Sequence, residues 1–127
     1  MKKTFLAVLL SGTWISLSEF IRNELIFKHY WIEHFKSLGL NFPSETINNA
    51  MWGLWSFILA GLIVFLVTRL KKVETITVTW IFSFLCMWIV MGNLNVLPFK
   101  LLVFAVPLSL LEVFIAELIA RKIIIKK

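Results

Sequence analysis

The chain has 127 residues, of which 60% are hydrophobic and 15% aromatic, and its formal net charge is +6. In soluble domains about half of the residues are apolar, even when glycine is counted as apolar. The apolar fraction of this chain is higher, and its apolar residues lie in long runs. These properties exclude an ordinary soluble domain and indicate an integral membrane protein with room for one helical bundle. The positive charges lie at the ends of the apolar runs, as topology signals do, so we expect no nucleic acid as a partner.

Four apolar runs are long enough to cross a bilayer core of about 30 Å as helices. Polar residues around Glu19 interrupt the first run. The apolar stretch before them, from Thr4 to Leu17, covers only about 21 Å, so the helix must continue to Phe27 to cross the bilayer. We expect the spans at residues 4–27, 46–69, 75–91 and 99–120. The predicted fold class is an all-α integral membrane protein, a four-transmembrane-helix bundle in a single membrane domain over residues 1–127.

The start of the first span is also typical of a secretory signal peptide. Lys2 and Lys3 precede the apolar run, and small residues follow it near Ser16. The helical apolar pattern continues beyond that point, so we expect an uncleaved first span. A cleaved leader is the alternative.

Residues 28–38, between the first two spans, have an amphipathic pattern that predicts a short interfacial helix on the outer side of the membrane. Gly39 is expected to end this helix. Its apolar face carries Trp31, Phe35 and Leu38. The residues expected to cap the next two spans are Ser44 or Asn41 for the second, and Thr75 or Thr77 for the third.

Basic residues are divided unequally between the two sides of a four-span arrangement. Nine of the 13 fall on one side: Lys2, Lys3, Arg69, Lys71, Lys72, Arg121, Lys122, Lys126 and Lys127. Those on the other side are Arg22, Lys28, Lys36 and Lys100. Basic residues concentrate on the cytoplasmic side, so both termini are predicted to be cytoplasmic (N-in/C-in). The same bias suits a bacterial inner (cytoplasmic) membrane.

The first span carries ionisable groups at membrane depth, where they normally face the interior of a bundle. Glu19 lies about 9 Å below the outer boundary, and it shares one helix face with Arg22 and Asn23. The other spans offer polar or indole groups in the same outer-leaflet layer. The candidate ligand-binding residues are Glu19, Arg22, Asn23, Trp52, Ser56, Trp88, Asn93, Asn95 and Ser109. The alternative is a structural ion pair with amide hydrogen bonds, each contact stabilising the bundle by roughly 0.6–2 kcal/mol.

Glu112 lies deeper, about 17 Å below the outer boundary by the same count. Pro107, five residues earlier, frees a backbone carbonyl and can kink the helix. Glu112 is therefore a candidate for a proton-coupled carboxyl. The alternative is a structural carboxyl that is hydrogen-bonded to Thr79, Ser83 or an indole. Small residues on the same stripe suit close helix packing: Ala105, Ser109 and Ala116.

Patterns for catalysis or metal binding are weak. His29 and His34 are five residues apart, about 140° around a helix, so they cannot share a metal as residues four apart can. The sulfur groups of Cys86 and Met87 are more typical of core packing than of a copper site. The sequence shows no catalytic triad, no glycine-rich phosphate loop and no haem-type histidine in a span. It therefore favours a protein with no catalytic residue, no metal site and no cofactor.

A glutamate in the first span of a small, basic, four-span chain resembles the pattern of small multidrug transporters. Those proteins have short loops, whereas this chain has the amphipathic segment 28–38 between its first two spans. None of their residue roles is therefore carried over to this chain.

The predicted function is the binding or carriage of a small amphipathic or lipid-like ligand in an outer-leaflet polar pocket. Glu19 and Arg22 would orient the polar head of the ligand, and Glu112 would couple a proton. The alternative is a non-catalytic accessory or scaffold subunit of a larger membrane complex. An enzyme acting on lipid would need a nucleophile or metal that the sequence does not offer. The expected partners are membrane lipid, the ligand, and further copies of the chain or a larger complex.

Overall fold

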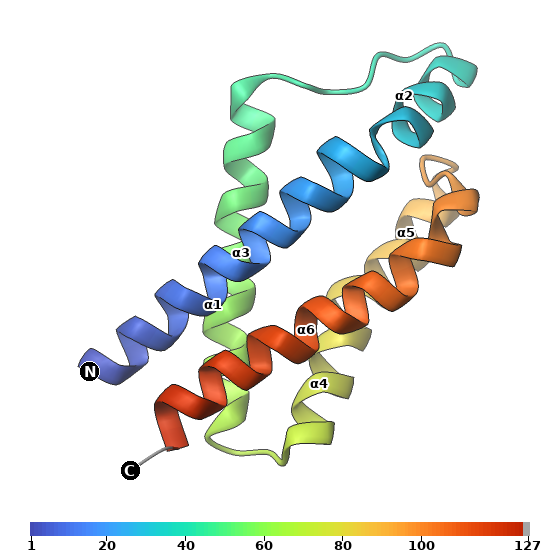
Figure 1. Cartoon of the computed structure of the whole chain (residues 1–127). Coiled ribbons are helices and arrows are strands. Elements are labelled where there is room, and N and C mark those ends of the chain that lie inside the picture. The colour runs from blue at the N-terminus through green and yellow to red at the C-terminus, as the bar shows by residue number, and fades with distance from the viewer. Residues whose placement is uncertain (126–127) are drawn as a thin grey trace.

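The computed structural model describes residues 1–125, which form helices and their connections without a β-strand (Figure 1). Four helical stretches are long and apolar enough to cross a membrane: Lys2–Ile26, Thr46–Val67, Lys72–Asn93 and Phe99–Ile125. The prediction of an all-α membrane fold with four spanning helices is confirmed at this level. Two residues that entered the prediction of topology, 126 and 127, lie outside the described residues.

The first and third stretches each contain a π-helical segment, which sequence reasoning did not predict. The helix α1 (Lys2–Phe20) continues as the π-helix η1 (Ile21–Ile26). In the third stretch, the π-helix η2 (Ile81–Leu85) separates α4 (Lys72–Trp80) from α5 (Cys86–Asn93). Such segments interrupt the regular ladder of hydrogen bonds and occur frequently at functional sites. Both lie beside the polar cluster described below.

The second and fourth stretches are more regular. They are α3 (Thr46–Val67) and the long α6 (Leu102–Ile125), which follows the short 3₁₀-helix η3 (Phe99–Leu101). The third stretch begins at Lys72 rather than at residue 75, and the fourth extends to Ile125 rather than ending at residue 120.

The predicted helix caps are wrong. The residue before α3 is Glu45, whose N–H donates to Oδ1 of Asn48 at 3.0 Å. The residue before α4 is Lys71, whose N–H donates to the Glu74 carboxylate at 2.9 Å. In both cases a side chain three residues into the helix decides where the helix begins. The threonine predicted as a cap at position 75 is instead buried inside α4.

The helix α2 (Lys28–Ser37) ends where the sequence predicts. Gly39 adopts a positive φ of 71°, and the Leu40 N–H donates to the carbonyl of Phe35 at 2.9 Å. This geometry satisfies carbonyl groups at the helix end and favours glycine, which has no Cβ to clash. The connecting segment then folds back, so that Phe42 packs edge-on against Phe35, with 5.3 Å between ring centroids.

Two apolar clusters hold the helices together. One joins α1, α3 and α6 at the end where the chain begins, and includes Ile15, Leu59, Ile63 and Ala116. The other lies toward the opposite end, between the third and fourth stretches, and includes Phe27, Phe84, Trp88 and Leu97. Figure 1 shows α1 and α6 side by side, with α3 crossing α1 and diverging from it toward Thr46. This divergence positions the candidate site.

The close crossing of α1 and α3 depends on Gly12. A Cβ at this position would lie 2.4 Å from Cδ1 of Phe57, well inside van der Waals contact. We expect Gly12→Val to lower the free energy of unfolding by about 1–3 kcal/mol, because the ring or the helices must move. Thermal unfolding in detergent measures this loss. Gly61→Val is the matched control, since a Cβ at Gly61 meets nothing within 4 Å. Equal melting temperatures for the two variants would contradict the crossing described.

Glu117 and Arg121 form the predicted ion pair across one turn of α6. Glu117 is fully buried, and Arg121 also donates to the Leu70 carbonyl at 3.1 Å. A further contact of 3.4 Å joins Arg121 to Oγ1 of Thr75. The pair therefore ties α6 to the connection between α3 and α4, which is more than the simple helix pair that the spacing suggests.

Candidate ligand-binding site

The polar face of the first stretch is buried, as its spacing predicts. Glu19 and Arg22 are only 4% and 5% exposed. The opposite face is exposed to the surroundings and is entirely apolar: Leu17, Phe20, Ile21 and Leu25. Because η1 begins directly after Phe20, the two charged residues lie on either side of the change from α- to π-helix.

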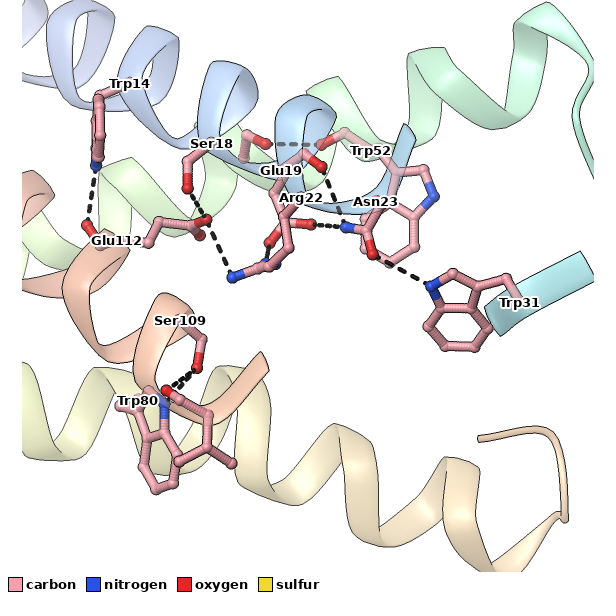
Figure 2. Close-up of polar contacts among 12 residues, drawn as sticks. Trp14, Ser18, Glu19, Arg22, Asn23, Trp31, Trp52, Trp80, Ser109 and Glu112 are labelled. Carbon is pink, nitrogen blue, oxygen red and sulfur yellow. Dashed lines mark hydrogen bonds and ion pairs between the residues drawn. The ribbon is translucent and has the colours of Figure 1, made fainter. Parts of the chain in front are cut away.

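Four residues at this change form a hydrogen-bonded chain (Figure 2). Arg22 forms an ion pair with one carboxylate oxygen of Glu19. The Asn23 amide donates to the other oxygen at 2.7 Å. The indole N–H of Trp31, on α2, donates to Oδ1 of Asn23 at 3.3 Å. The chain of contacts links α1, through η1, to α2, and gives both Glu19 oxygens a donor.

Glu112, on α6, approaches the same cluster from the other side. Its Oε2 accepts a hydrogen bond from the Ser18 hydroxyl at 2.5 Å and lies 3.4 Å from the Arg22 guanidinium. The Trp14 indole donates to the Glu112 backbone carbonyl at 3.0 Å. These partners all come from the first stretch. The predicted partners on the third span, Thr79 and Ser83, are therefore wrong.

The cluster contains one guanidinium for two buried carboxyl groups. Arg22 also lies over the Phe84 ring, with its guanidinium carbon 5.1 Å from the ring centroid. Phe84 belongs to η2, so the two π-helical segments meet at this cation–π contact. Nη1 of Arg22 and Oε1 of Glu112 are buried without a hydrogen-bond partner. Both carboxylate oxygens of Glu19 thus have hydrogen-bond donors, whereas only one oxygen of Glu112 has a donor.

A cleft of about 390 Å³ opens beside this cluster. It lies between the end of α1, η1 and α2 on one side and the first half of α3 on the other. Its lining is mostly apolar, with a smaller number of polar groups from the first stretch and from α3. The lining residues that matter most here are Glu19, Asn23, Trp31, Trp52, Gly53 and Ser56. The divergence of α3 from α1 leaves room for this cleft.

A second, inner cavity of about 30 Å³ lies behind Glu19. It has room for about one or two water molecules. Arg22, Phe84 and Trp88 line it, and it shares five lining residues with the cleft: Glu19, Asn23, Trp31, Trp52 and Met91. Glu19 therefore borders both spaces, whereas Arg22 lines the inner cavity and not the cleft.

The structure brings six of the nine predicted ligand-binding residues to these two spaces. Four line the cleft: Glu19, Asn23, Trp52 and Ser56. Arg22 and Trp88 line the inner cavity, and Glu19, Asn23 and Trp52 line both. Glu112 contacts Arg22 and Ser18 but lines neither space.

The other three predicted residues lie elsewhere. The Ser109 hydroxyl accepts a hydrogen bond from the Trp80 indole at 2.9 Å, which ties α6 to α4 (Figure 2). Asn93 and Asn95 are exposed at the end of α5. Asn95 adopts a φ of 58° in the turn, and its carbonyl lies 2.7 Å from Nε2 of His34. Ser109 thus contributes to a contact between two helices, and Asn95 to a turn.

Sequence reasoning missed several residues that line the cleft. Asn48 and Asn49 line it from the first turn of α3, and Gly53 from the next turn. Glu24 and Ser16 line it from the first stretch. The pair of asparagines at the start of an apolar span is a visible signal for a polar opening. The glycine carries no such signal, because only the position of α1 shows what its missing side chain leaves open.

Comparison with protein-family models, with curated proteins and with solved structures finds no match to this chain. The fold defines the class as an all-helical protein with four helices that are long and apolar enough to span a membrane. Within residues 1–125, no group of three or more histidine, cysteine, aspartate or glutamate side chains is placed to hold a metal ion. The candidate site is therefore defined by the cleft and the charged cluster at its inner end.

Proposed function

We propose that this protein binds a small amphipathic or lipid-like ligand in the cleft between η1, α2 and α3, and carries it. The supporting observation is a mostly apolar cleft of about 390 Å³ that ends on the buried Glu19–Asn23 pair. Small-molecule sites typically have volumes of about 300–1,000 Å³, apolar walls and a few polar groups that fix orientation. In this proposal Trp31 and Trp52 pack against the apolar part of the ligand, and Glu19 and Asn23 contact its head.

The proposal places the cleft in the outer leaflet. Both termini are cytoplasmic, as the distribution of basic residues favours, and α2 lies along the outer interface of a bacterial inner membrane. Two features of α2 support this position: it carries charged side chains on one side, and Trp31 and Phe35 on the other side line the cleft. A ligand would then enter from the outer leaflet or from the water beside it.

Glu112 enters this proposal as a coupled carboxyl rather than as a ligand contact. It does not line the cleft, and its route to Glu19 passes through the Arg22 guanidinium. A change in the charge of either carboxyl group changes how strongly Arg22 is held by the other one. Proton coupling would therefore act through Arg22.

The second candidate function is a non-catalytic accessory or scaffold subunit of a larger membrane complex. One observation favours it: both Glu19 oxygens already have donors within the chain, from Arg22 and Asn23. A purely structural tie between helices would have this property. In that case the cleft would carry no specific ligand.

Filling the cleft distinguishes the two candidates. A Cβ at Gly53 meets nothing within 4 Å, so Gly53→Phe places a ring in the cleft without a clash at its base. Gly61 is equally open, lies on the same helix and does not line the cleft, so Gly61→Phe is the matched control. Each protein is purified in a neutral maltoside detergent. Co-purified lipids and small molecules are then measured by mass spectrometry, and melting temperatures are measured with and without added amphiphiles.

The ligand-binding proposal predicts that wild type and Gly61→Phe retain the same bound molecule, whereas Gly53→Phe retains at least about tenfold less. An amphiphile at 100 times its Kd would stabilise wild type by about 2.7 kcal/mol, and Gly53→Phe should lose this gain. The same retention and the same stabilisation in all three proteins would overturn the proposal and favour the scaffold.

A further inference from the structure

The charges that face the cleft all have one sign. Glu19 and Glu24 line it, and none of the described residues that line it is a lysine, arginine or histidine. Lys28 neutralises Glu24 from outside the lining, with its Nζ 2.6 Å from the carboxylate. The guanidinium of Arg22 lies behind Glu19, in the inner cavity and over Phe84. A head group that reaches the inner end of the cleft therefore meets a carboxylate first.

Aromatic rings form much of the remaining lining. They come from α1, α2, the connection after α2, and α3: Phe20, Trp31, Phe35, Phe42 and Trp52. Trp31 and Phe42 are stacked, with 6.1 Å between their ring centroids. The face of an aromatic ring attracts a cation, and sites that combine such rings with a carboxylate suit quaternary ammonium groups.

The buried cluster behind the cleft holds two carboxyl groups and one guanidinium. Glu19 and Glu112 are 4% and 1% exposed, and the one guanidinium between them is that of Arg22. With both carboxyl groups ionised, one negative charge is uncompensated, which is unfavourable in a buried site. A proton on Glu112 balances the cluster when the cleft is empty, and a single positive charge beside Glu19 would balance it with both carboxyl groups ionised.

Arg22 already has a second partner within reach. Its Nη1 lies 3.4 Å from Oε2 of Glu112, and neither Nη1 nor the other Glu112 oxygen has a hydrogen-bond partner. If a bound cation contacts the Glu19 carboxylate in place of Arg22, the Arg22 guanidinium can move closer to the Glu112 carboxylate. The cation can thus be accommodated without leaving a buried arginine unpaired.

We propose that the cleft selects an amphiphile whose head carries one positive charge, an amine or a quaternary ammonium group, held between the Glu19 carboxylate and the aromatic rings. This proposal rests on the proposed function and names the class of its ligand. Arg22 acts as a positioning residue that moves from Glu19 toward Glu112 when the cation binds.

The test uses four amphiphiles with the same octyl chain and different heads. They are octyltrimethylammonium (positive), octylphosphocholine (zwitterionic), octyl glucoside (neutral) and octanoate (negative). Each is titrated below its micelle concentration into the protein in dodecyl maltoside, and its Kd is obtained by calorimetry. We expect octyltrimethylammonium to bind at least about tenfold more tightly than octyl glucoside, and octanoate to bind most weakly of the four.

Three variants test the assignment of the charge. Glu19→Gln is expected to bring the cationic and neutral ligands within about threefold of each other. Glu112→Gln is also expected to weaken the binding of the cationic ligand, because Arg22 then has only Glu19 as a charged partner. Glu33→Gln is the control, since this carboxylate is exposed on α2 and does not line the cleft, and it should keep the preference. If Glu19→Gln fails to fold, Glu112→Gln still tests the exchange, because Glu112 does not line the cleft.

The outcomes separate this proposal from the proposed function. If all four amphiphiles bind equally, or octanoate binds most tightly, and Gly53→Phe abolishes their binding, the charge preference is overturned while the binding function stands. If octylphosphocholine binds more tightly than octyltrimethylammonium, the ligand is a zwitterionic lipid head and the proposal is likewise overturned. If none of the four binds to wild type, both are overturned.

Discussion

Arg22→Gln is expected to lower the free energy of unfolding by about 3–5 kcal/mol, because it leaves two buried carboxyl groups without their positive partner. Arg22 forms the ion pair with Glu19, approaches Glu112 within 3.4 Å and lies over the Phe84 ring. The loss should be visible as a large drop in melting temperature in detergent. Glu19→Gln should be milder, because Arg22 retains Glu112 as a charged partner.

Compensating changes test whether this cost comes from charge. The triple variant Arg22→Gln, Glu19→Gln and Glu112→Gln removes all three charges, and it should recover much of the stability that Arg22→Gln loses. Arg22→Lys keeps the charge but lacks the planar fork that reaches both carboxyl groups, so it should fall between wild type and Arg22→Gln. A melting temperature for Arg22→Gln within a degree of wild type would contradict the buried cluster.

Arg121→Gln is expected to have the second-largest effect, about 3 kcal/mol, at the lower end of the range for a broken buried pair. The variant leaves Glu117 fully buried and unpaired, and it removes the hydrogen bond to the Leu70 carbonyl. The lower value reflects the side chain of Arg121, which is 23% exposed and so partly solvated. Thermal unfolding in detergent again gives the measurement.

A neighbouring basic residue supplies the control for this second pair. Lys122 is exposed at the same end of α6, and Lys122→Gln should change stability by no more than about 0.5 kcal/mol. Pairing Arg121→Gln with Glu117→Gln should restore part of the loss, since no buried charge then remains alone. If Lys122→Gln and Arg121→Gln have the same melting temperature, stability depends on the total positive charge at this end of α6 and not on the contact of Arg121 with Leu70.

The two ion pairs should also differ in what else they change. Arg22 contacts Glu19, which lines the cleft, whereas none of the partners of Arg121 lines it. Substitution of Arg121 is therefore expected to lower stability without altering the order in which the four octyl amphiphiles bind. Arg22 variants that remain folded should alter both. This contrast separates a general loss of stability from a change at the site.

Sequence alone determined the helical class and the approximate position of each apolar run. A segment of about 20 apolar residues satisfies its backbone in lipid as a helix, so the spans could be placed without knowing their neighbours. The burial of Glu19 and Arg22 on one face of the first span followed in the same way, because helical periodicity is a local property. The stop at Gly39 was equally local.

Tertiary structure alone decided which residues meet. Counting along each helix gives depth, but it gives neither the rotation of a helix about its axis nor the identity of its neighbour. Ser109 was therefore predicted to join the layer of Glu19, yet its hydroxyl accepts a hydrogen bond from Trp80. For Glu112 the structural alternative named Thr79, Ser83 or an indole as partners, yet its side chain contacts Ser18 and Arg22.

The cleft itself depends on the angle between two helices. Gly12 allows α1 and α3 to cross closely against Phe57, and beyond the crossing the helices diverge (Figure 1). Gly53 then faces open space, although its position in the sequence looks no different from that of any helical glycine. A crossing angle follows from the packing of two surfaces that are distant in sequence, so periodicity within one segment cannot predict it. For the same reason the sequence predicted the charged end of the site, and only the assembled helices showed the apolar space that opens beside it.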